Sequence, residues 1–414
     1  MKKDNSFCTH ALDVLASLLS LILFFWNVAA NIWAVVSFYQ EEKYLSMGVF
    51  IFLVLSSSVL LQTFSWLWYS ESPKNLDTKV ERFTKEHGLL ALVHIMQLGV
   101  FLRCLGMLEL AISSFKCKST YQNRGTEILS FDLSALYLFK AFSESAPQIV
   151  LMTTSIIQME DFQLFTVIKI AGSLSSLSFT VLSYHRSMRS FVSEKLKMGW
   201  PSSIIYFLWN LFLIGPRVVC VSLFASVLPC YIAAHFLSLW TLLVIWAWWK
   251  KTDFMDTKAG EWLYRATVGL IWYFSWFNVT SGNTKLRGII YHMVMGADTM
   301  LLLGLWWWKR SVESARLSPF PINPYILIGL LVIIYITGVL IKLVYYWKCH
   351  PNKPVLKMNL KDEESEVKTE CDATCYDSLE ENTIETPEPK AEPKSTVLSG
   401  IHKRIRNMAV NFYS

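Results

Sequence analysis

Long runs of apolar residues dominate the first 347 residues of the chain. Ten such runs are separated by short polar segments, at roughly 12–39, 46–70, 88–113, 131–158, 162–184, 202–227, 230–249, 264–282, 288–308 and 322–347. A helix of about 20 apolar residues spans the hydrocarbon core of a bilayer, whereas membrane strands are shorter and alternate in hydrophobicity. The runs are too long and too uniform for strands, so the pattern predicts an all-α polytopic membrane protein.

Basic residues in the short connecting segments predict the orientation of the helices. The N-terminal lysines place the N-terminus in the cytoplasm, and the basic loops at 71–87 and 185–201 belong on the same side. Five full crossings would put the second loop outside, so one of the first five runs must enter and leave on one side. The run at 131–158 is the candidate, because Pro147 lacks an amide hydrogen and is expected to divide it into two half-helices.

The same count applies to the second half of the chain. Lysines around and after the last run predict a cytoplasmic C-terminus, so one of the later five runs must also be re-entrant. The run at 264–282 is the candidate, because it ends in a polar stretch that contains glycine. The sequence therefore predicts eight transmembrane helices plus two re-entrant half-membrane helices. Four crossings and one half-membrane helix in each half suggest two pseudo-repeats.

Composition and motifs narrow the class of function. Hydrophobic residues make up 53% of the chain and charged residues 17%, well below the roughly 25% charged residues of soluble proteins. The net charge of +6 comes without a basic stretch that contains interleaved aromatic residues, so nucleic acid is not an expected partner. The eight cysteines are scattered, and no HExxH, GxSxG or P-loop pattern is present. We therefore expect no enzymatic activity, no metal site and no cofactor.

The stretch "LFKAFSESAPQIV" at 138–150 places charges where lipid would be expected. An ionisable residue at the centre of a membrane helix costs about 2.5–3.5 kcal/mol unless it faces a partner or water. Lys140 and Glu144 are four residues apart and share one helix face, and Asp132 returns to nearly that face. One interpretation is that this pair only fixes the register of the helices.

Other ionisable residues in the apolar runs favour a second interpretation. Arg103 and Arg217, on different runs, are the cationic candidates to meet the acidic residues. Non-helical backbone at membrane depth is tolerated only where protein or a water-filled cavity covers it. Together, these charges and the expected break predict a hydrophilic furrow through the transmembrane domain at 1–347.

The chain changes character after the last apolar run. Residues 348–396 are rich in acidic residues, Thr, Ser and Pro, which predicts a disordered cytoplasmic tether. The end of the chain, "VLSGIHKRIRNMAVNFYS" at 397–414, repeats apolar residues at spacings of three and four with basic residues between them, which predicts a basic amphipathic helix. This helix either binds acidic lipids at the membrane surface or docks on the transmembrane domain as a latch.

Five stretches in chain order resemble the XK-related proteins: "FSESAPQIV" (142–150), "SYHRSMR" (183–189), "SSIIYFLWNLFLIGPRVV" (202–219), "LYRATVGLIWYFSWFNV" (263–279) and "KLVYYW" (342–347). The resemblance covers roughly residues 8–350. It implies a multi-pass plasma-membrane phospholipid scramblase that exposes phosphatidylserine in apoptosis, moving lipids down their gradients without ATP. It also implies activation when an effector caspase cuts the tail, and pairing with a single-pass immunoglobulin-like chaperone subunit.

The resemblance further implies roles for individual residues. A lipid headgroup would slide along the polar furrow while its acyl chains stay in lipid, and the candidates to hold its phosphate are Arg103, Arg186 and Arg217. Scramblases of the family carry two acidic residues four apart on the first helix, where this chain has Asn27 and Asn31. Lys140 stands where relatives have an acid. We therefore expect a more basic furrow than in those relatives.

The tail offers two candidate caspase sites, because caspases cut after aspartate when a small residue follows. Asp372 precedes Ala373 and Asp377 precedes Ser378. Asp372 is the first choice, with an acidic residue two positions before it. The alternative to a caspase-activated scramblase is a non-scrambling membrane scaffold or transport-like subunit that acts through a partner protein.

Overall fold

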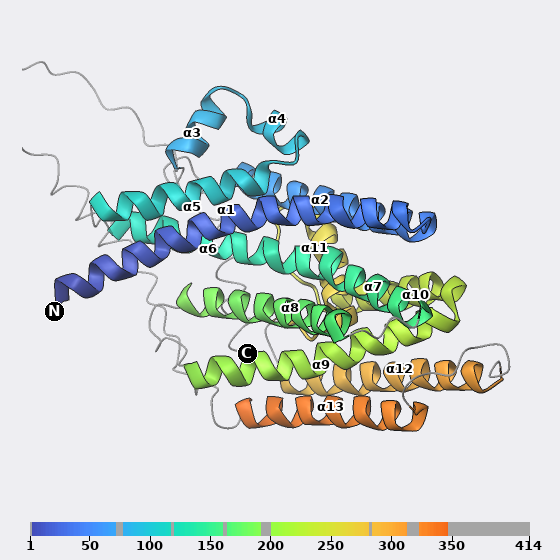
Figure 1. Cartoon of the computed structure of the whole chain (residues 1–414). Helices are drawn as coiled ribbons and strands as arrows, with labels where there is room; N and C mark the ends of the chain where they lie inside the picture. The colour runs from blue at the N-terminus through green and yellow to red at the C-terminus, as the bar shows by residue number, and fades with distance from the viewer. Residues whose placement is uncertain are drawn as a thin grey trace, which may run out of the picture. The chain divides into compact units, whose positions relative to one another are not determined.

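The computed structural model describes residues 2–71, 78–116, 120–159, 164–191, 200–280, 284–312 and 323–346. All regular structure in these stretches is helical, which confirms the all-α prediction. The helices, shown in Figure 1, are α1 Lys2–Gln40, α2 Tyr44–Glu71, α3 Lys79–Glu86, α4 Leu90–Ile95, α5 Gly99–Lys116, α6 Thr120–Lys140, the π-helical turn η2 Ala141–Ser145, α7 Ala146–Met159, α8 Leu164–Phe191, α9 Trp200–Val227, α10 Pro229–Trp249, α11 Lys258–Phe274, α12 Thr284–Val312 and α13 Pro324–Val344.

The chain divides into two compact units. The described residues all belong to the first unit, which comprises Met1–Cys349 with Val397–Ser414. The second unit, His350–Thr396, lies outside the described residues, as do both candidate caspase sites and the predicted C-terminal helix. The predicted domain boundaries therefore stay a prediction.

Seven of the described helices contain a stretch that is long and apolar enough to cross a membrane. These stretches are Leu18–Gln40, Tyr44–Ser70, Val167–Met188, Trp200–Val227, Pro229–Trp249, Leu286–Val312 and Pro324–Val344. They confirm a polytopic membrane protein. The exact number of crossings stays a prediction.

The run at 131–158 is not divided into two half-helices. Helix α6, η2 and α7 follow one another without interruption, and Pro147 is the second residue of α7. The amide of Ala146 bonds to the carbonyl of Ala141, five residues back instead of four. Pro147 removes one amide hydrogen bond to the preceding turn, yet the chain continues as helix through the π-helical turn into α7 without a break. The expected break is a π-helical turn, a feature frequent at functional sites.

The first half of the chain turns instead within the run at 88–113. Helix α4 ends at Ile95, α5 begins at Gly99, and the chain turns sharply between them (Figure 1). Gln97, in this turn, has a φ of 63°, a left-handed conformation that is uncommon for residues other than glycine. We therefore expect the segment of α4 and α5, rather than 131–158, to be the re-entrant element of this half.

Helix α11 ends where the polar stretch of its run begins. It has 17 residues, which corresponds to about 26 Å, and residues 275–280 after it are not α-helical. It is not among the seven helices that could cross a membrane by length and composition. These observations agree with the re-entrant path expected for 264–282, which stays a prediction.

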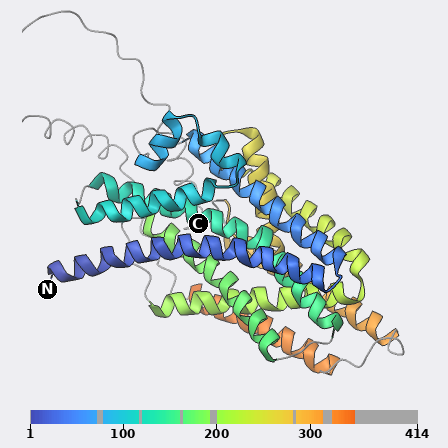
Figure 2. The ribbon, with the colours of Figure 1, turned by 45° about the horizontal axis from the view of Figure 1, so that its top comes forward.

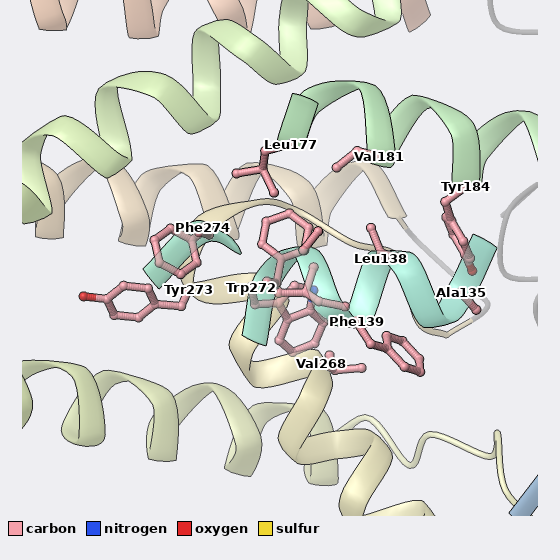
Figure 3. Packing of buried hydrophobic residues seen from close by; sticks show 14 of the residues in the cluster. Ala135, Leu138, Phe139, Leu177, Val181, Tyr184, Val268, Trp272, Tyr273 and Phe274 are labelled. Atoms are coloured by element: carbon pink, nitrogen blue, oxygen red, sulfur yellow. The ribbon is translucent and has the colours of Figure 1, made fainter. Parts of the chain in front are cut away.

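The main hydrophobic core contains side chains of α6, α8 and α11 that meet at close range (Figure 3). Phe139 of α6 and Trp272 of α11 are almost completely buried there. Helix α1, by contrast, is peripheral: among its described side chains, Phe38 alone is buried. In two views it runs beside the α5–α6 pair (Figures 1 and 2). Helix α1 therefore has one face toward the core helices and another toward the surroundings.

Helices α9 and α13 pack closely at Gly338, where a larger side chain should be destabilising. A Cβ at this position would lie 3.0 Å from the backbone carbonyl carbon of Phe212, which cannot move aside as a side chain can. Gly338→Leu should lower the free energy of unfolding by about 1–3 kcal/mol, the usual cost of overpacking. Unfolding by SDS in mixed micelles measures this change.

Gly329→Leu is the matched control on the same helix. A Cβ at Gly329 meets nothing within 4 Å, and leucine favours helix more than glycine does. This variant should be neutral or slightly stabilising. Equal losses for the two variants would contradict a close α9–α13 contact at Gly338.

Candidate functional site

Four side chains that the sequence singles out lie together where α1 meets the junction of α6 and η2. The ammonium of Lys140 donates a hydrogen bond to the side-chain carbonyl of Asn27, with 2.5 Å between Nζ and Oδ1. The amide of Asn31 donates to Oε1 of Glu144 at 3.0 Å. Lys140 and Glu144 also form an ion pair, with 3.8 Å between Nζ and Oε1. We call these four residues the polar seam; each hydrogen bond joins residues 113 positions apart in the chain.

Aromatic contacts hold α1 so that its two asparagines face α6. The ring of Phe24 lies 5.8 Å from that of Phe101 on α5, and the ring of Phe38 lies 5.8 Å from that of Phe50 on α2. Asn27 and Asn31 lie between these two contacts along α1. They are four residues apart, so they share one face of the helix, and both are half-buried. The polar seam is therefore at the margin of the helical core, on a peripheral helix.

The two charges of the polar seam are unequally compensated. Glu144 is buried, with 4% of its side chain exposed, and it accepts a hydrogen bond from the amide of Asn31 at 3.0 Å. Lys140 is 25% exposed, and its short hydrogen bond goes to a neutral amide oxygen, while the carboxylate lies at the far limit of an ion pair. An ammonium has three donors. Lys140 is therefore a partly exposed cation with capacity to bind a further acceptor.

Arg103 and Asp132 form a separate pair inside the protein. The guanidinium and the carboxylate are 2.9 Å apart, and their side chains are only 2% and 4% exposed. Arg103 also donates to the hydroxyl and the carbonyl of Ser65, both at 3.1 Å, and its guanidinium lies 4.0 Å from the ring centre of Tyr69. Asp132 thus pairs with Arg103, although its spacing also placed it near the helix face of Lys140.

Arg217 belongs to a third set, on α9, α10, α11 and α12. It donates to Asp298 at 2.5 Å and to the carbonyl of Tyr273 at 3.1 Å, and its side chain is 3% exposed. His235 contacts the other oxygen of Asp298 at 3.0 Å and the hydroxyl of Tyr273 at 3.1 Å. In Figure 3 this hydroxyl points away from the other labelled rings of the core. Asp298 therefore holds two basic groups in one network.

Arg186 lies apart from these three sets. Its side chain is exposed near the C-terminal end of α8, and its guanidinium is 5.7 Å from the ring centre of Trp200. Of the arginines predicted to hold phosphate, Arg103 and Arg217 are bound to carboxylates in the interior and Arg186 is at the surface. The predicted path residues therefore form separate sets rather than one line of charges.

Sequence reasoning did not assign Asp298 and His235 to the site. The signal available was that each is an ionisable residue inside an apolar run. Arg217 and Asp298 are 81 residues apart, so no helical periodicity relates them. In the described part of the chain, no three His, Cys, Asp or Glu side chains are grouped closely enough to hold a metal ion.

Comparison with known proteins gives consistent matches over most of the chain. A family model described as XK-related protein matches residues 15–351. The chain is 39% identical over 360 residues to XK-related protein 8 of Tetraodon nigroviridis, covering 85% of this chain and 86% of that protein. It is 39% identical over 351 residues to the protein of the same name in Gasterosteus aculeatus, covering 82% and 84%. For the Pan troglodytes protein of that name the identity is 35% over 342 residues, covering 82% and 84%.

Proposed function

Because the chain belongs to the XK-related family, we propose that it is a phospholipid scramblase of the plasma membrane with both termini in the cytoplasm. In this proposal it exposes phosphatidylserine at the cell surface in apoptosis and needs no ATP. The observation that carries the proposal is the polar seam, a set of charged and amide side chains on the peripheral helix α1, on α6 and in η2. Polar groups at membrane depth normally face a partner or water, and they mark pathways for polar substrates.

The polar seam supports a mechanism in which the headgroup replaces interactions within the protein. A headgroup carries a phosphate that accepts hydrogen bonds, and transferring such a charge through hydrocarbon without partners is costly. Lys140 and the amides of Asn27 and Asn31 supply donors along α1 and α6. The acyl chains stay in the lipid outside α1, where Trp26 and Trp33 are 71% and 76% exposed.

Control of the activity belongs to the tail in this proposal. An effector caspase cuts after Asp372, or after Asp377 as the second choice, and releases the C-terminal segment. A single-pass immunoglobulin-like chaperone subunit is the proposed membrane partner. These parts of the proposal depend on the family resemblance and on the sequence of the tail.

A membrane scaffold that acts through a partner protein is the second candidate function. The interior ion pair of Arg103 with Asp132 and the network around Arg217 favour it, because buried pairs of this kind fix how helices pack. In a scaffold, the polar seam would serve only to attach α1.

Lipid transfer in liposomes distinguishes the two functions. Purified full-length protein is reconstituted with a fluorescent phospholipid in both leaflets, and the fraction that an impermeant reductant can bleach is followed with and without effector caspase. The cut protein should give bleaching of nearly all the label, and Asp372→Ala should abolish this effect if Asp372 is the site. Bleaching limited to the outer leaflet after verified cleavage and insertion would favour the scaffold.

A further inference from the structure

The phosphate-binding role expected of the arginines is better filled by another cation. Arg103 and Arg217 are each bound to a carboxylate and are 2% and 3% exposed, so a passing lipid cannot reach them without breaking an interior ion pair. Lys140 differs from both arginines in its exposure and in the distance to its carboxylate partner. It is 25% exposed, it lies next to the peripheral helix α1, and its carboxylate partner is 3.8 Å away.

The neighbours of Lys140 make its charge available to a ligand. Asn31 takes up part of the charge of Glu144 through a hydrogen bond to Oε1, the same oxygen that faces Lys140. The closest acceptor of Lys140 is the neutral side chain of Asn27, which a charged acceptor can replace. The hydrogen bond from Lys140 to Asn27 already has a charged donor, and an anionic acceptor would add an attraction between opposite charges that a neutral amide oxygen does not supply. An anionic oxygen is therefore the preferred acceptor at this site.

We propose that Lys140 is the residue that selects anionic phosphate-bearing lipid headgroups, binding the headgroup in exchange for Asn27. This inference depends on the proposed scramblase function and names the specificity of the same site. The ligand is assigned to lipid because the polar seam lies beside side chains of α1 that are largely exposed, at the margin of the described helices. A zwitterionic headgroup also carries a phosphate, but its two charges cancel, whereas the additional carboxylate of phosphatidylserine gives that headgroup a net negative charge that the ammonium of Lys140 attracts.

The ratio of the transfer rates of phosphatidylserine and phosphatidylcholine tests the proposal in full-length protein treated with effector caspase. The wild-type protein should favour phosphatidylserine. Lys140→Gln should lower the ratio by about fivefold, which corresponds to the free energy of a partly exposed ion pair. Lys140→Arg should retain the preference, and Lys140→Glu should lower the ratio further. Because both rates come from one preparation, differences in yield cancel.

Lys169→Gln is the matched control. Lys169 is an exposed lysine on α8 and belongs to none of the three polar sets, so its loss should leave the ratio unchanged. A wild-type protein that transfers lipid with a ratio unaffected by Lys140→Gln would overturn the inference and leave the proposed function standing.

Photo-crosslinking gives a measurement that does not need transfer. Phosphatidylserine and phosphatidylcholine with a photoreactive group near the phosphate are incorporated in vesicles with the uncut full-length protein, and the crosslinked peptide is identified by mass spectrometry. Peptides that contain Lys140 should be labelled more by phosphatidylserine, and Lys140→Gln should remove this excess. If no lipid is transferred, the proposed function fails, but this excess would still support the headgroup site.

Two crosslinking outcomes would overturn the assignment. The first is equal labelling by both lipids in the wild-type protein. The second is loss of the phosphatidylserine excess when inorganic phosphate is added at constant ionic strength, because the site would then bind soluble phosphate rather than a lipid headgroup.

Discussion

Asp132→Asn is expected to lower the free energy of unfolding by about 3–5 kcal/mol, the usual cost of removing one partner from a buried ion pair. Asparagine keeps the size of the side chain and an acceptor oxygen, but it removes the negative charge. The guanidinium of Arg103, 2% exposed, would then stay in the interior without a compensating carboxylate at 2.9 Å. Unfolding by SDS in mixed micelles measures the loss.

A double variant separates the cost of leaving a buried charge unpaired from the cost of losing a favourable ion pair. Replacing a buried pair by apolar residues of similar volume is often neutral or stabilising, so Arg103→Met with Asp132→Leu should recover most of the lost stability. Glu86→Gln, at an exposed acid on α3, is the control and should change stability by no more than about 0.5 kcal/mol. A double variant less stable than Asp132→Asn would show that the pair is itself a strong net stabiliser.

The double variant also bears on the lipid path. Arg103 and Asp132 are path candidates by sequence, yet in the structure they pair with each other, and Arg103 also donates a hydrogen bond to Ser65. If the stable double variant still transfers lipid after caspase treatment, this pair fixes helix packing and the path runs elsewhere. The polar seam would then be the remaining candidate in the first half of the chain.

The helices were predictable from sequence because a membrane requires long apolar stretches, whatever their neighbours are. The π-helical turn was not predictable in the same way. A proline at position 147 is compatible with a break, a kink or a new helix start, and tertiary contacts decide among them. One such contact joins the hydroxyls of Ser143 in η2 and Ser57 in α2, which are 2.7 Å apart. These residues are 86 positions apart, so the contact is not visible in a local pattern.

The polar seam was predictable in two parts that needed different information. The spacing of Lys140 and Glu144 places them on one helix face, which local periodicity shows. Asn27 and Asn31 carry no charge and became candidates only through the family resemblance. That these two pairs meet follows from the packing of α1 on α5 and α6, which no local pattern encodes. The same reason explains why the partner of Arg217 was not identified.

Asp298→Asn is expected to lower the free energy of unfolding by about 3–5 kcal/mol, because it leaves Arg217 buried without its carboxylate. The carbonyl of Tyr273 would still accept a hydrogen bond from Arg217, but a neutral acceptor does not compensate the charge. His235 would lose its carboxylate partner as well. Unfolding by SDS measures the loss, and Glu42→Gln, at an exposed acid after α1, is the control with an expected change within about 0.5 kcal/mol.

The size of this loss also tests the predicted furrow. In a dry interior, an unpaired guanidinium keeps its full desolvation cost, and the loss reaches the expected range. In a water-filled furrow, water would solvate Arg217 after its partner is removed, and the loss would fall to the 0–1 kcal/mol or so that is typical of exposed pairs. A small loss would therefore contradict an interior network and place Arg217 on a hydrated path. A large loss would leave Lys140 as the accessible cation for the headgroup, because Arg103 and Arg217 would both be committed to packing.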